Sequence, residues 1–310
     1  MSAMRIKVID LDGALTVQDE VMAGLPGCDA DLFIARDLAP RLRLLAGRSA
    51  LKTLAERLGP PTRGEICFYG SGDFHHLSHL LVSRFDQPMS VVHFDNHPDW
   101  TRFPRTLNCG SWVSRLLEQR NIERVVTLGP CSSDLNAPQL KGADLPLLRA
   151  GRLEVHPLAS GATFYAGPGF ETAGVRGAAG IAADGLRWAG LEDGDFAAHV
   201  ETIAGQLPAT PLWITLDKDV LGPDEAVTNW DQGRLPLHLV LQAITLFARH
   251  RPVLGMDVCG DYSPEGDNGA LRTLLANLDR DQRRDPHGNA IAINGATNGR
   301  ILRHMGDILQ

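Results

Sequence analysis

The stretch "VVHFDNHPDW", residues 91–100, carries the features that decide the fold of this chain. Two valines lead into Asp95, His97 and Asp99, three side chains that can bind a metal ion, at alternate positions. A β-branched run that ends in carboxylates and an imidazole is typical of a buried strand whose carboxyl end contributes to a binding site. This interpretation depends on whether other strands of the chain end in the same way.

Short β-rich runs alternate with segments of helical periodicity along the chain. Strands are expected at residues 5–11, 65–71, 89–95, 123–129, 152–158, 211–219 and 252–259. Helices are expected at residues 47–59, 74–85, 109–120, 235–250 and 269–280. Such alternation builds right-handed βαβ crossovers, and therefore a mostly parallel sheet with helices on both faces. We predict a single three-layer α/β/α domain over residues 1–310, with residues 160–195 as a long loop containing a short helix.

Ionisable residues gather at the ends of several predicted strands. The stretch "FYGSGDFHH" places His75 and His76 after one strand, and "WITLDKD" places Asp217 and Asp219 after another. The last predicted strand is followed by Asp261 in "DVCGDY". Because ligands of open parallel sheets bind beyond the carboxyl ends of the strands, we expect these side chains to meet in one crevice.

A divalent cation is the simplest reason to crowd carboxylates into one crevice, because bare carboxylates would repel one another. Alternate side chains of a straight strand stand roughly 7 Å apart. Asp95, His97 and Asp99 therefore reach one site only if the strand turns, and Pro98 favours its end there. Two ions about 3.5–4 Å apart that share carboxylates would ease this reach. Oxygen and imidazole donors favour Mn²⁺ or Mg²⁺, with Zn²⁺, Ni²⁺ and Fe²⁺ as alternatives.

Taken together, these motifs resemble the metal framework of the ureohydrolases, the family of arginase, agmatinase and formiminoglutamase, whose fold is the arginase–deacetylase fold. The resemblance covers about residues 66–265 and is specific because two acidic motifs occur together. The "GSGDFHH" stretch looks like the family's Gly-Gly-Asp-His turn with one extra residue. That insertion makes His75 the better candidate for the ligand and leaves His76 as its rival.

The resemblance implies two Mn²⁺ ions per chain. The residues that match the family's ligands are His75, Asp95, His97, Asp99, Asp217 and Asp219. Asp95 and Asp217 would bridge the ions, His75 and Asp99 would complete one coordination shell, and the remaining two residues would complete the other. A hydroxide between the metals would attack a non-peptide C–N bond of a guanidine, amidine or formimino compound, with Asp99 holding its proton. The resemblance also implies a small-molecule substrate and a homo-oligomer.

The sequence departs from the family at two catalytic positions. Cys109 stands where the family's hydrolases have a proton-transferring His, and a thiol of ordinary pKa is a poor proton carrier at neutral pH. Gly260 stands where the guanidinium-binding Glu would be, with Asp261 next to it. Either Asp261 replaces that Glu with a shorter reach, or the substrate carries no guanidinium. We therefore treat Asp99, Asp261 and Cys109 as candidate catalytic residues.

Weaker candidates surround this predicted site. Pocket walls are expected from residues 100–110, 160–190 and 224–234, and possible substrate contacts are Asn108, Asn229, Trp230 and Asp231. His93 lies on the same strand face as Asp95, one pair earlier, and is interpreted as a core residue. Lys218 must point to the opposite face from the two aspartates beside it, so we expect a buried acidic partner for it.

Three other functions remain open on the sequence. The N-terminal "DLDGA" imitates the Asp-x-Asp-Gly-Thr motif of haloacid-dehalogenase phosphatases, with Ala14 in place of the Thr, and we interpret Asp10, Asp12 and Gly13 as a strand-ending turn. A metal-binding protein without hydrolytic activity is a second alternative, motivated by the missing His and Glu. A deacetylase-like amidohydrolase with one Zn²⁺ is a third.

The composition of the chain limits its expected partners and cellular compartment. The net charge is −7 and the pI about 5.9, without a long basic run, which argues against nucleic-acid binding. The N-terminal residues lack the pattern of a secretory signal, and we expect no membrane association. Five scattered cysteines without a CxxC motif favour a reducing cytoplasm.

Overall fold

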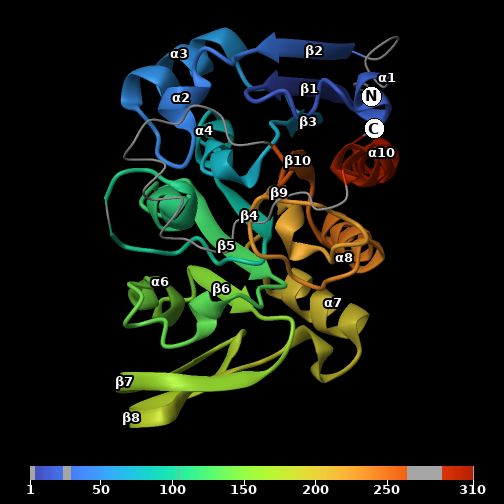
Figure 1. Ribbon diagram of the computed structural model, residues 1–310. Coiled ribbons are helices and arrows are strands. Elements are labelled where there is room, and N and C mark those ends of the chain that lie inside the picture. Colours follow the sequence, from blue (N-terminus) through green and yellow to red (C-terminus); the bar gives the residue numbers. More distant parts are fainter. Residues whose placement is uncertain (1–3, 24–28, 104, 264–287, 310) are drawn as a thin grey trace.

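An eight-stranded sheet lies at the centre of the computed structural model, which describes residues 4–23, 29–103, 105–263 and 288–309 (Figure 1). All neighbouring strands run parallel, in the order β2-β1-β3-β10-β9-β4-β5-β6. Its strands are β1 (Arg5–Asp10), β2 (Asp29–Ile34), β3 (Glu65–Phe68), β4 (Met89–Phe94), β5 (Ile122–Leu128), β6 (Leu153–His156), β9 (Leu212–Asp217) and β10 (Val253–Cys259).

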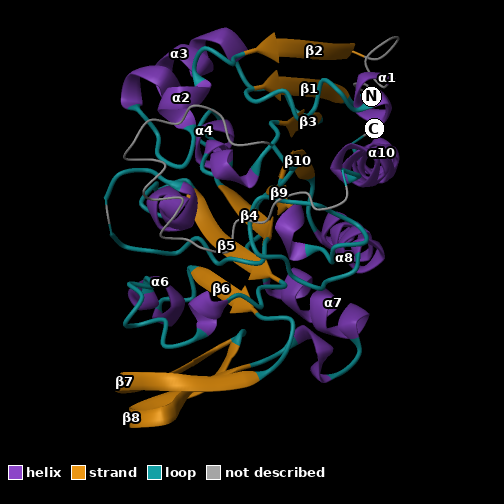
Figure 2. Ribbon diagram, viewed as in Figure 1, coloured by secondary structure: helices purple, strands orange, loops and turns teal. Residues whose placement is uncertain are grey.

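Helices cover both faces of the sheet, as Figure 2 shows. On one face lie α2 (Ala39–Leu42), α3 (Arg48–Leu58), α4 (Leu77–Val82), α5 (Trp112–Leu116) and α6 (Leu145–Arg149). On the other lie α1 (Asp19–Ala23), α7 (Phe196–Gln206), α8 (Leu237–His250) and α10 (Ala290–Ile308). The three-layer α/β/α architecture with a mostly parallel sheet, predicted from the alternation of strands and helices, is confirmed.

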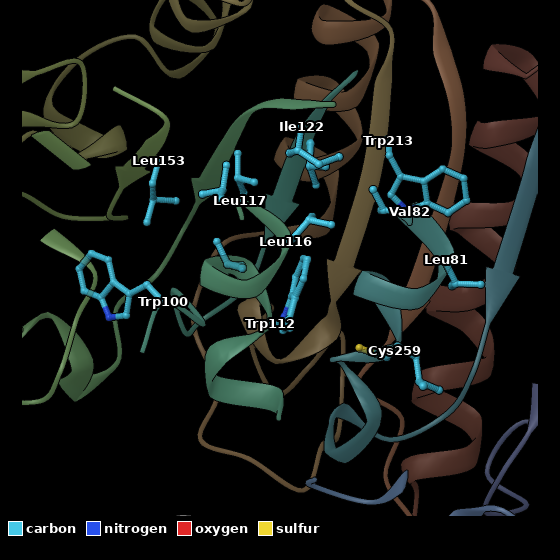
Figure 3. Close-up of a cluster of buried hydrophobic side chains, with 14 of the residues drawn as sticks. Leu81, Val82, Trp100, Trp112, Leu116, Leu117, Ile122, Leu153, Trp213 and Cys259 are labelled. Carbon is cyan, nitrogen blue, oxygen red and sulfur yellow. The ribbon is translucent and has the colours of Figure 1, made fainter. Parts of the chain in front are cut away.

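The two faces of the sheet contribute to two separate hydrophobic cores. Successive side chains of a strand point to opposite faces, so Trp213 packs with α4 and α5 while Ile214 packs with α7 and α8. Figure 3 shows the first of these cores, where Trp112 and Leu116 of α5 approach the sheet. Both faces of the central strands are buried, which explains their nearly continuous apolar sequences.

The prediction for residues 160–195 was wrong. They form a long antiparallel hairpin of β7 (Gly161–Thr172) and β8 (Val175–Trp188), which extends from the end of the molecule next to β6 (Figure 1). Its glycines and alanines hide the alternation by which a strand is recognised. Buried anchors that include Tyr165, Leu186 and Trp188 hold it against the body, and that tertiary packing decides its conformation. The helix expected at 269–280 lies outside the described residues.

The N-terminal acidic motif forms a turn, as predicted. Asp10 ends β1, and its carboxylate accepts a hydrogen bond of 2.8 Å from the backbone N–H of Gly13 and pairs with Arg36 at 2.6 Å. Asp12 accepts from the backbone of Ala14 at 3.1 Å. Local backbone groups and an arginine therefore satisfy both carboxylates, which gives the motif a structural role.

The strand order brings together the residues singled out from the sequence. β3, β10, β9 and β4 are neighbours at the middle of the sheet, and the parallel direction places their carboxyl ends at one edge. The segments after these four strands carry His75, Asp261, Asp219 and Asp95. Within the described ranges, no helix has both the length and the apolar character that crossing a bilayer requires.

Truncating the centre of the sheet should destabilise the protein. Ile214→Ala removes a fully buried side chain from β9 and should lower the free energy of unfolding by about 2–5 kcal/mol, because a cavity remains. Urea denaturation measures the difference. Ile181→Ala, at a position that is 83% exposed on β8, is the control and should change stability by less than about 0.5 kcal/mol. Equal effects of the two variants would contradict this description of the core.

Candidate metal centre

His75 faces three carboxylates from two other strand ends. Its Nδ1 lies 3.0 Å from Asp95 Oδ2, 3.2 Å from Asp99 Oδ2 and 3.5 Å from Asp217 Oδ2. The short helical turn after β3 positions the ring, which is buried. His76, the rival candidate, is buried as well but does not line the pocket described below. The geometry therefore favours His75 as the ligand.

Asp95 is shared between two groups of potential ligands. Its Oδ2 faces His75, while its Oδ1 lies 3.5 Å from Nδ1 of His97. The same His97 nitrogen is 3.0 Å from Asp219 Oδ2. Atoms of His75, His93, Asp95 and Asp99 thus form one group, and atoms of Asp95, His97 and Asp219 form a second group. A third group joins His75 and Asp217 to the thiol of Cys259. The donors of the two groups that share Asp95 are imidazole nitrogens and carboxylate oxygens.

The chain turns sharply after β4, as the spacing of the motif required. The strand ends at Phe94, and Asp99 adopts a left-handed backbone with φ of +50°. Asp and Asn tolerate that region better than other non-glycine residues, and strained backbone is frequent at functional sites. The backbone N–H of His97 donates to Asp95 Oδ1 at 2.6 Å, and Trp112 Nε1 donates to Asp99 Oδ2 at 2.6 Å. These bonds hold the turn in place.

A pocket of about 430 Å³, partly open to solvent, lies over these residues. Its described lining consists of Gly72, His75, Asp95, His97, Asp99, Cys109, Gly110, Asp134, Asp217, Asp219 and Trp230. The six residues proposed as ligands from the sequence therefore meet at one pocket. Cys109 is there as well.

Burial and mutual repulsion dominate the electrostatics of this cluster. Burial, together with the charge of Asp95, raises the pKa of Asp99 to about 8. Burial and the charges of Asp217 and Asp95 raise the pKa of Asp219 well above its ordinary range, and burial also raises that of Asp217. Burial alone would raise the pKa of Asp95, but hydrogen bonds from three histidines outweigh it and lower the pKa.

The pKa values of the two facing imidazoles are raised as well, which for a base favours the charged form. Burial alone would lower the pKa of His75, but hydrogen bonds to Asp95 and Asp99 raise it well above 6.5. For His97, burial alone would again lower the pKa, but the charge of Asp219 and hydrogen bonds to Asp219, Asp231 and Asp95 together raise it well above 6.5. Each imidazole therefore tends to carry the positive charge that the carboxylates need.

The donor set fits divalent cations. Four carboxylates are buried together, and among the described residues no lysine or arginine pairs with any of them. Three of the four have a raised pKa, which means that their charged forms lack compensation. Oxygen and imidazole donors in two adjoining groups would accept two hard or borderline ions and relieve that repulsion.

Lys218 has the buried acidic partner that was predicted for it. Its Nζ lies 2.6 Å from Asp261 Oδ1, and both side chains are fully buried. Gln18 and Asn298 also donate to this carboxylate oxygen, at 2.7 and 3.1 Å. Asp261 is not among the described residues that line the pocket. Its neighbours explain this position, because they hold the carboxylate around the buried ammonium of Lys218.

Gly260 leaves no room for a side chain. Its φ is +88°, a region that L-residues rarely adopt, and a Cβ would lie 2.3 Å from Asp217 Oδ1. The β10 loop therefore approaches Asp217 with bare backbone. Neither Gly260 nor Asp261 can supply a carboxylate to the pocket.

The weaker candidates have separate places. Trp230 lines the pocket, and Asp231 bonds to His97 at 2.7 Å instead of facing the pocket. Asn229 is buried and accepts from the backbone of Ser263. Asn108 donates to the backbone of Thr106 at the start of a helical turn. None of the hairpin residues between 161 and 188 is among the described lining of the pocket.

Several supporting residues were not identified from the sequence. His93 is a buried residue, as interpreted, but its Nε2 also lies 2.9 Å from Asp95 Oδ2. The strand alternation that puts it on the face of Asp95 was the available signal. Behind His75, Nε2 meets Thr215 Oγ1 at 3.1 Å, and Thr215 donates to Asp257 at 2.7 Å. That contact joins residues 140 positions apart, which no local pattern predicts.

Comparison with known proteins agrees with this geometry. No protein-family model matches the sequence. An uncharacterized protein of Thermotoga maritima is 26% identical over 207 residues, which span 66% of this chain and 61% of that relative. Proclavaminate amidinohydrolase from Streptomyces clavuligerus superposes with a TM-score of 0.57 at 16% identity, covering 100% of this chain and 93% of its own. The chain has the arginase fold.

Two arginase structures support the same conclusion. The arginase from Medicago truncatula gives a TM-score of 0.55 at 12% identity, covering 98% of this chain and 86% of its own. The arginase from Bacillus subtilis gives 0.55 at 11% identity and covers 98% of both chains. At identities this low, the structural likeness establishes the fold alone. A fold hosts many functions, so the function depends on the residues of the site.

Breaking the Lys218–Asp261 pair should destabilise the protein strongly. Asp261→Ala leaves the ammonium of Lys218 buried without a counter-charge, so the free energy of unfolding should fall by about 3–5 kcal/mol. Urea denaturation of the purified variant tests this. The double variant Lys218→Met with Asp261→Leu removes both charges and should recover much of the loss. A double variant less stable than Asp261→Ala would show that the pair is not the cause.

The metal-free protein should lose stability as pH rises from 7 to 8. In this range the folded state retains protons on Asp99, whose pKa is about 8, and on His75 and His97, whose raised pKa values exceed those of the unfolded chain. His79 and His93, whose pKa values are lowered, are mostly neutral in both states here. Urea denaturation of chelator-treated protein at intervals across this range measures the trend. A free energy of unfolding that increases with pH would contradict it.

Proposed function

We propose that this chain is a metal-dependent hydrolase of the ureohydrolase type that acts on a non-peptide C–N bond of a small molecule. The observation that carries the proposal is that Asp95 belongs to two ligand groups, one with His75 and Asp99 and one with His97 and Asp219. A carboxylate shared by two adjoining groups is the arrangement expected for a pair of divalent ions. The likeness in fold to arginases and to an amidinohydrolase supports the same class of reaction.

The proposed ligands divide between two ions. His75, Asp95, Asp99 and Asp217 would hold one, and Asp95, His97, Asp217 and Asp219 would hold the other. Mn²⁺ is the proposed metal, with Zn²⁺, Ni²⁺ and Fe²⁺ as alternatives. Cys259 donates to Asp217 at 3.2 Å, but burial raises the pKa of its thiol, which disfavours the thiolate that a softer metal would select.

Bound divalent ions would supply a hydroxide nucleophile at neutral pH by lowering the pKa of water. Asp99 is the proposed proton carrier, because it lines the pocket and Trp112 fixes its Oδ2. Its left-handed backbone turns the carboxylate into the cluster. Trp230 forms part of the pocket wall and would restrict the water that reaches the substrate.

The pocket favours a substrate without a guanidinium group. Gly260 and Asp261 contribute no carboxylate to the pocket, and Asp134 is the remaining acidic residue of the described lining outside the proposed ligands. A guanidinium is bound best by a carboxylate that accepts two parallel hydrogen bonds, and Asp134 is the one described lining residue outside the proposed ligands that offers a carboxylate. We therefore rank formimino and other amidine compounds ahead of guanidines.

One observation supports a second candidate, a metal-binding protein without hydrolytic activity. Cys109 lines the pocket where the family's hydrolases have a His, and an ordinary thiol transfers protons poorly at neutral pH. A one-metal amidohydrolase is the remaining alternative. The number of bound ions separates it from the binuclear proposal.

Cellular setting and assembly form the last part of the proposal. The described cysteines, namely Cys67, Cys109, Cys131 and Cys259, form no disulfide with one another. That arrangement is consistent with a reducing compartment, and we propose a cytoplasmic location. We also propose a homo-oligomer, and light scattering of the purified protein measures its mass.

Purified protein loaded with Mn²⁺ should contain two ions per chain by elemental analysis. It should release urea, formamide or ammonia in a screen of guanidino, formimino and acyl-amide compounds. Asp99→Asn should lower kcat by about 100- to 10,000-fold, because it removes the proton carrier and also changes one of the proposed ligands. Asp10→Asn is the control and should keep activity, since Asp10 bonds Gly13 and Arg36 away from the pocket. A content near one ion per chain would contradict the binuclear site. If protein with two bound ions releases no product from any of these compounds, the second candidate, a metal-binding protein without hydrolytic activity, is favoured.

A further inference from the structure

We propose that Asp231 is a positioning residue that holds the ring of His97 ready to bind a divalent cation through Nδ1. This inference rests on the proposed function, because it concerns one half of the same metal site. Asp231 Oδ1 lies 2.7 Å from His97 Nε2, the ring nitrogen on the other side from the ligand group. The motifs that identify the proposed metal ligands do not include Asp231.

Asp231 acts on the tautomer of the His97 imidazole, that is, on which ring nitrogen carries the proton. Nδ1 of His97 faces the carboxylates, at 3.0 Å from Asp219 and 3.5 Å from Asp95. A cation at that side requires the lone pair on Nδ1, so the single proton of the neutral ring must lie on Nε2. A carboxylate that accepts from Nε2 favours this tautomer and increases the basicity of the ligand nitrogen.

Asn96 fixes Asp231 in turn. Its Nδ2 donates to Asp231 Oδ2 at 3.1 Å and to the backbone oxygen of the same residue at 3.0 Å. Its Oδ1 accepts from the backbone of Cys131 at 3.1 Å, and its own N–H donates to Asp219 Oδ1 at 3.0 Å. Every polar group of this side chain is used. The residue between Asp95 and His97 therefore ties the Asp231 loop to the ligand group.

A packed aromatic ring confines His97 from another side. Trp230 lies edge-on to the imidazole, with ring centroids 6.0 Å apart, and its Nε1 donates to Asp73 at 3.1 Å. Rotation of the imidazole would break the bond to Asp231 and disturb this contact. The loop that carries Trp230 and Asp231 thus determines the ring orientation.

The other imidazole of the site is held differently. His75 Nε2 contacts the neutral hydroxyl of Thr215, which donates to Asp257. His97 instead contacts a carboxylate directly, and that carboxylate is 28% exposed at the edge of the site. The two halves of the site should therefore respond differently to the loss of Asp231, with the half that contains His97 weakened.

Calorimetric titration of MnCl₂ into chelator-treated full-length protein tests this inference. For Asp231→Ala, one of two binding events should weaken by about 10- to 100-fold while the other keeps its affinity. Asp231→Asn retains an oxygen that can accept from Nε2 but no charge, and its affinity should fall between those of wild type and Asp231→Ala. Glu201→Ala is the matched control, since it breaks a histidine–carboxylate contact of the same 2.7 Å with His250 away from the site.

The outcomes separate the two proposals. Wild-type protein that binds no Mn²⁺ overturns the proposed function and the positioning role together. If wild-type protein binds two ions and Asp231→Ala binds them with unchanged affinities, the positioning role alone is overturned. Weakening of Mn²⁺ binding in Glu201→Ala equal to that in Asp231→Ala also overturns the positioning role. If Asp231→Ala does not fold, wild-type affinity in Asp231→Asn overturns the role.

Discussion

The main physical constraint on this structure is the burial of four carboxylates at the ends of adjacent parallel strands. Asp95, Asp99, Asp217 and Asp219 are each less than a tenth exposed, and their mutual repulsion opposes folding around that edge of the sheet. Imidazoles at hydrogen-bond distance offset part of this cost. The remainder is the physical reason to expect cations, because charge of the opposite sign is what the cluster lacks.

Much of the surrounding architecture holds this cluster in position. The buried Lys218–Asp261 pair lies between strand ends and joins Gln18 and Asn298 from the N-terminal and C-terminal parts of the chain. Gly260 allows the backbone after β10 to approach Asp217. Residues that do not line the pocket, such as Gln18 and Asn298, thus help to fix the backbone at the strand ends.

Local patterns predicted the parts of the fold and site that depend on local chemistry. The apolar run before Asp95 and the run before Asp217 both read as buried strands, and the acidic residues after them follow from the carboxyl-end rule for parallel sheets. The buried partner of Lys218 was predicted from alternation alone. The hairpin at 161–188 was missed because glycine and alanine give little periodic signal, and its conformation depends on packing against the body.

The sequence by itself determined which side chains could bind metal and on which strand ends they stand, since residue type and strand period are local properties. Only the tertiary structure decided how these residues are used. It turned Asp261 toward Lys218, brought His75 and not His76 to the lining of the pocket, and placed Asp231 behind His97. Each of these outcomes joins segments far apart in the chain, so it depends on strand order and backbone approach, which spacing along the sequence does not encode.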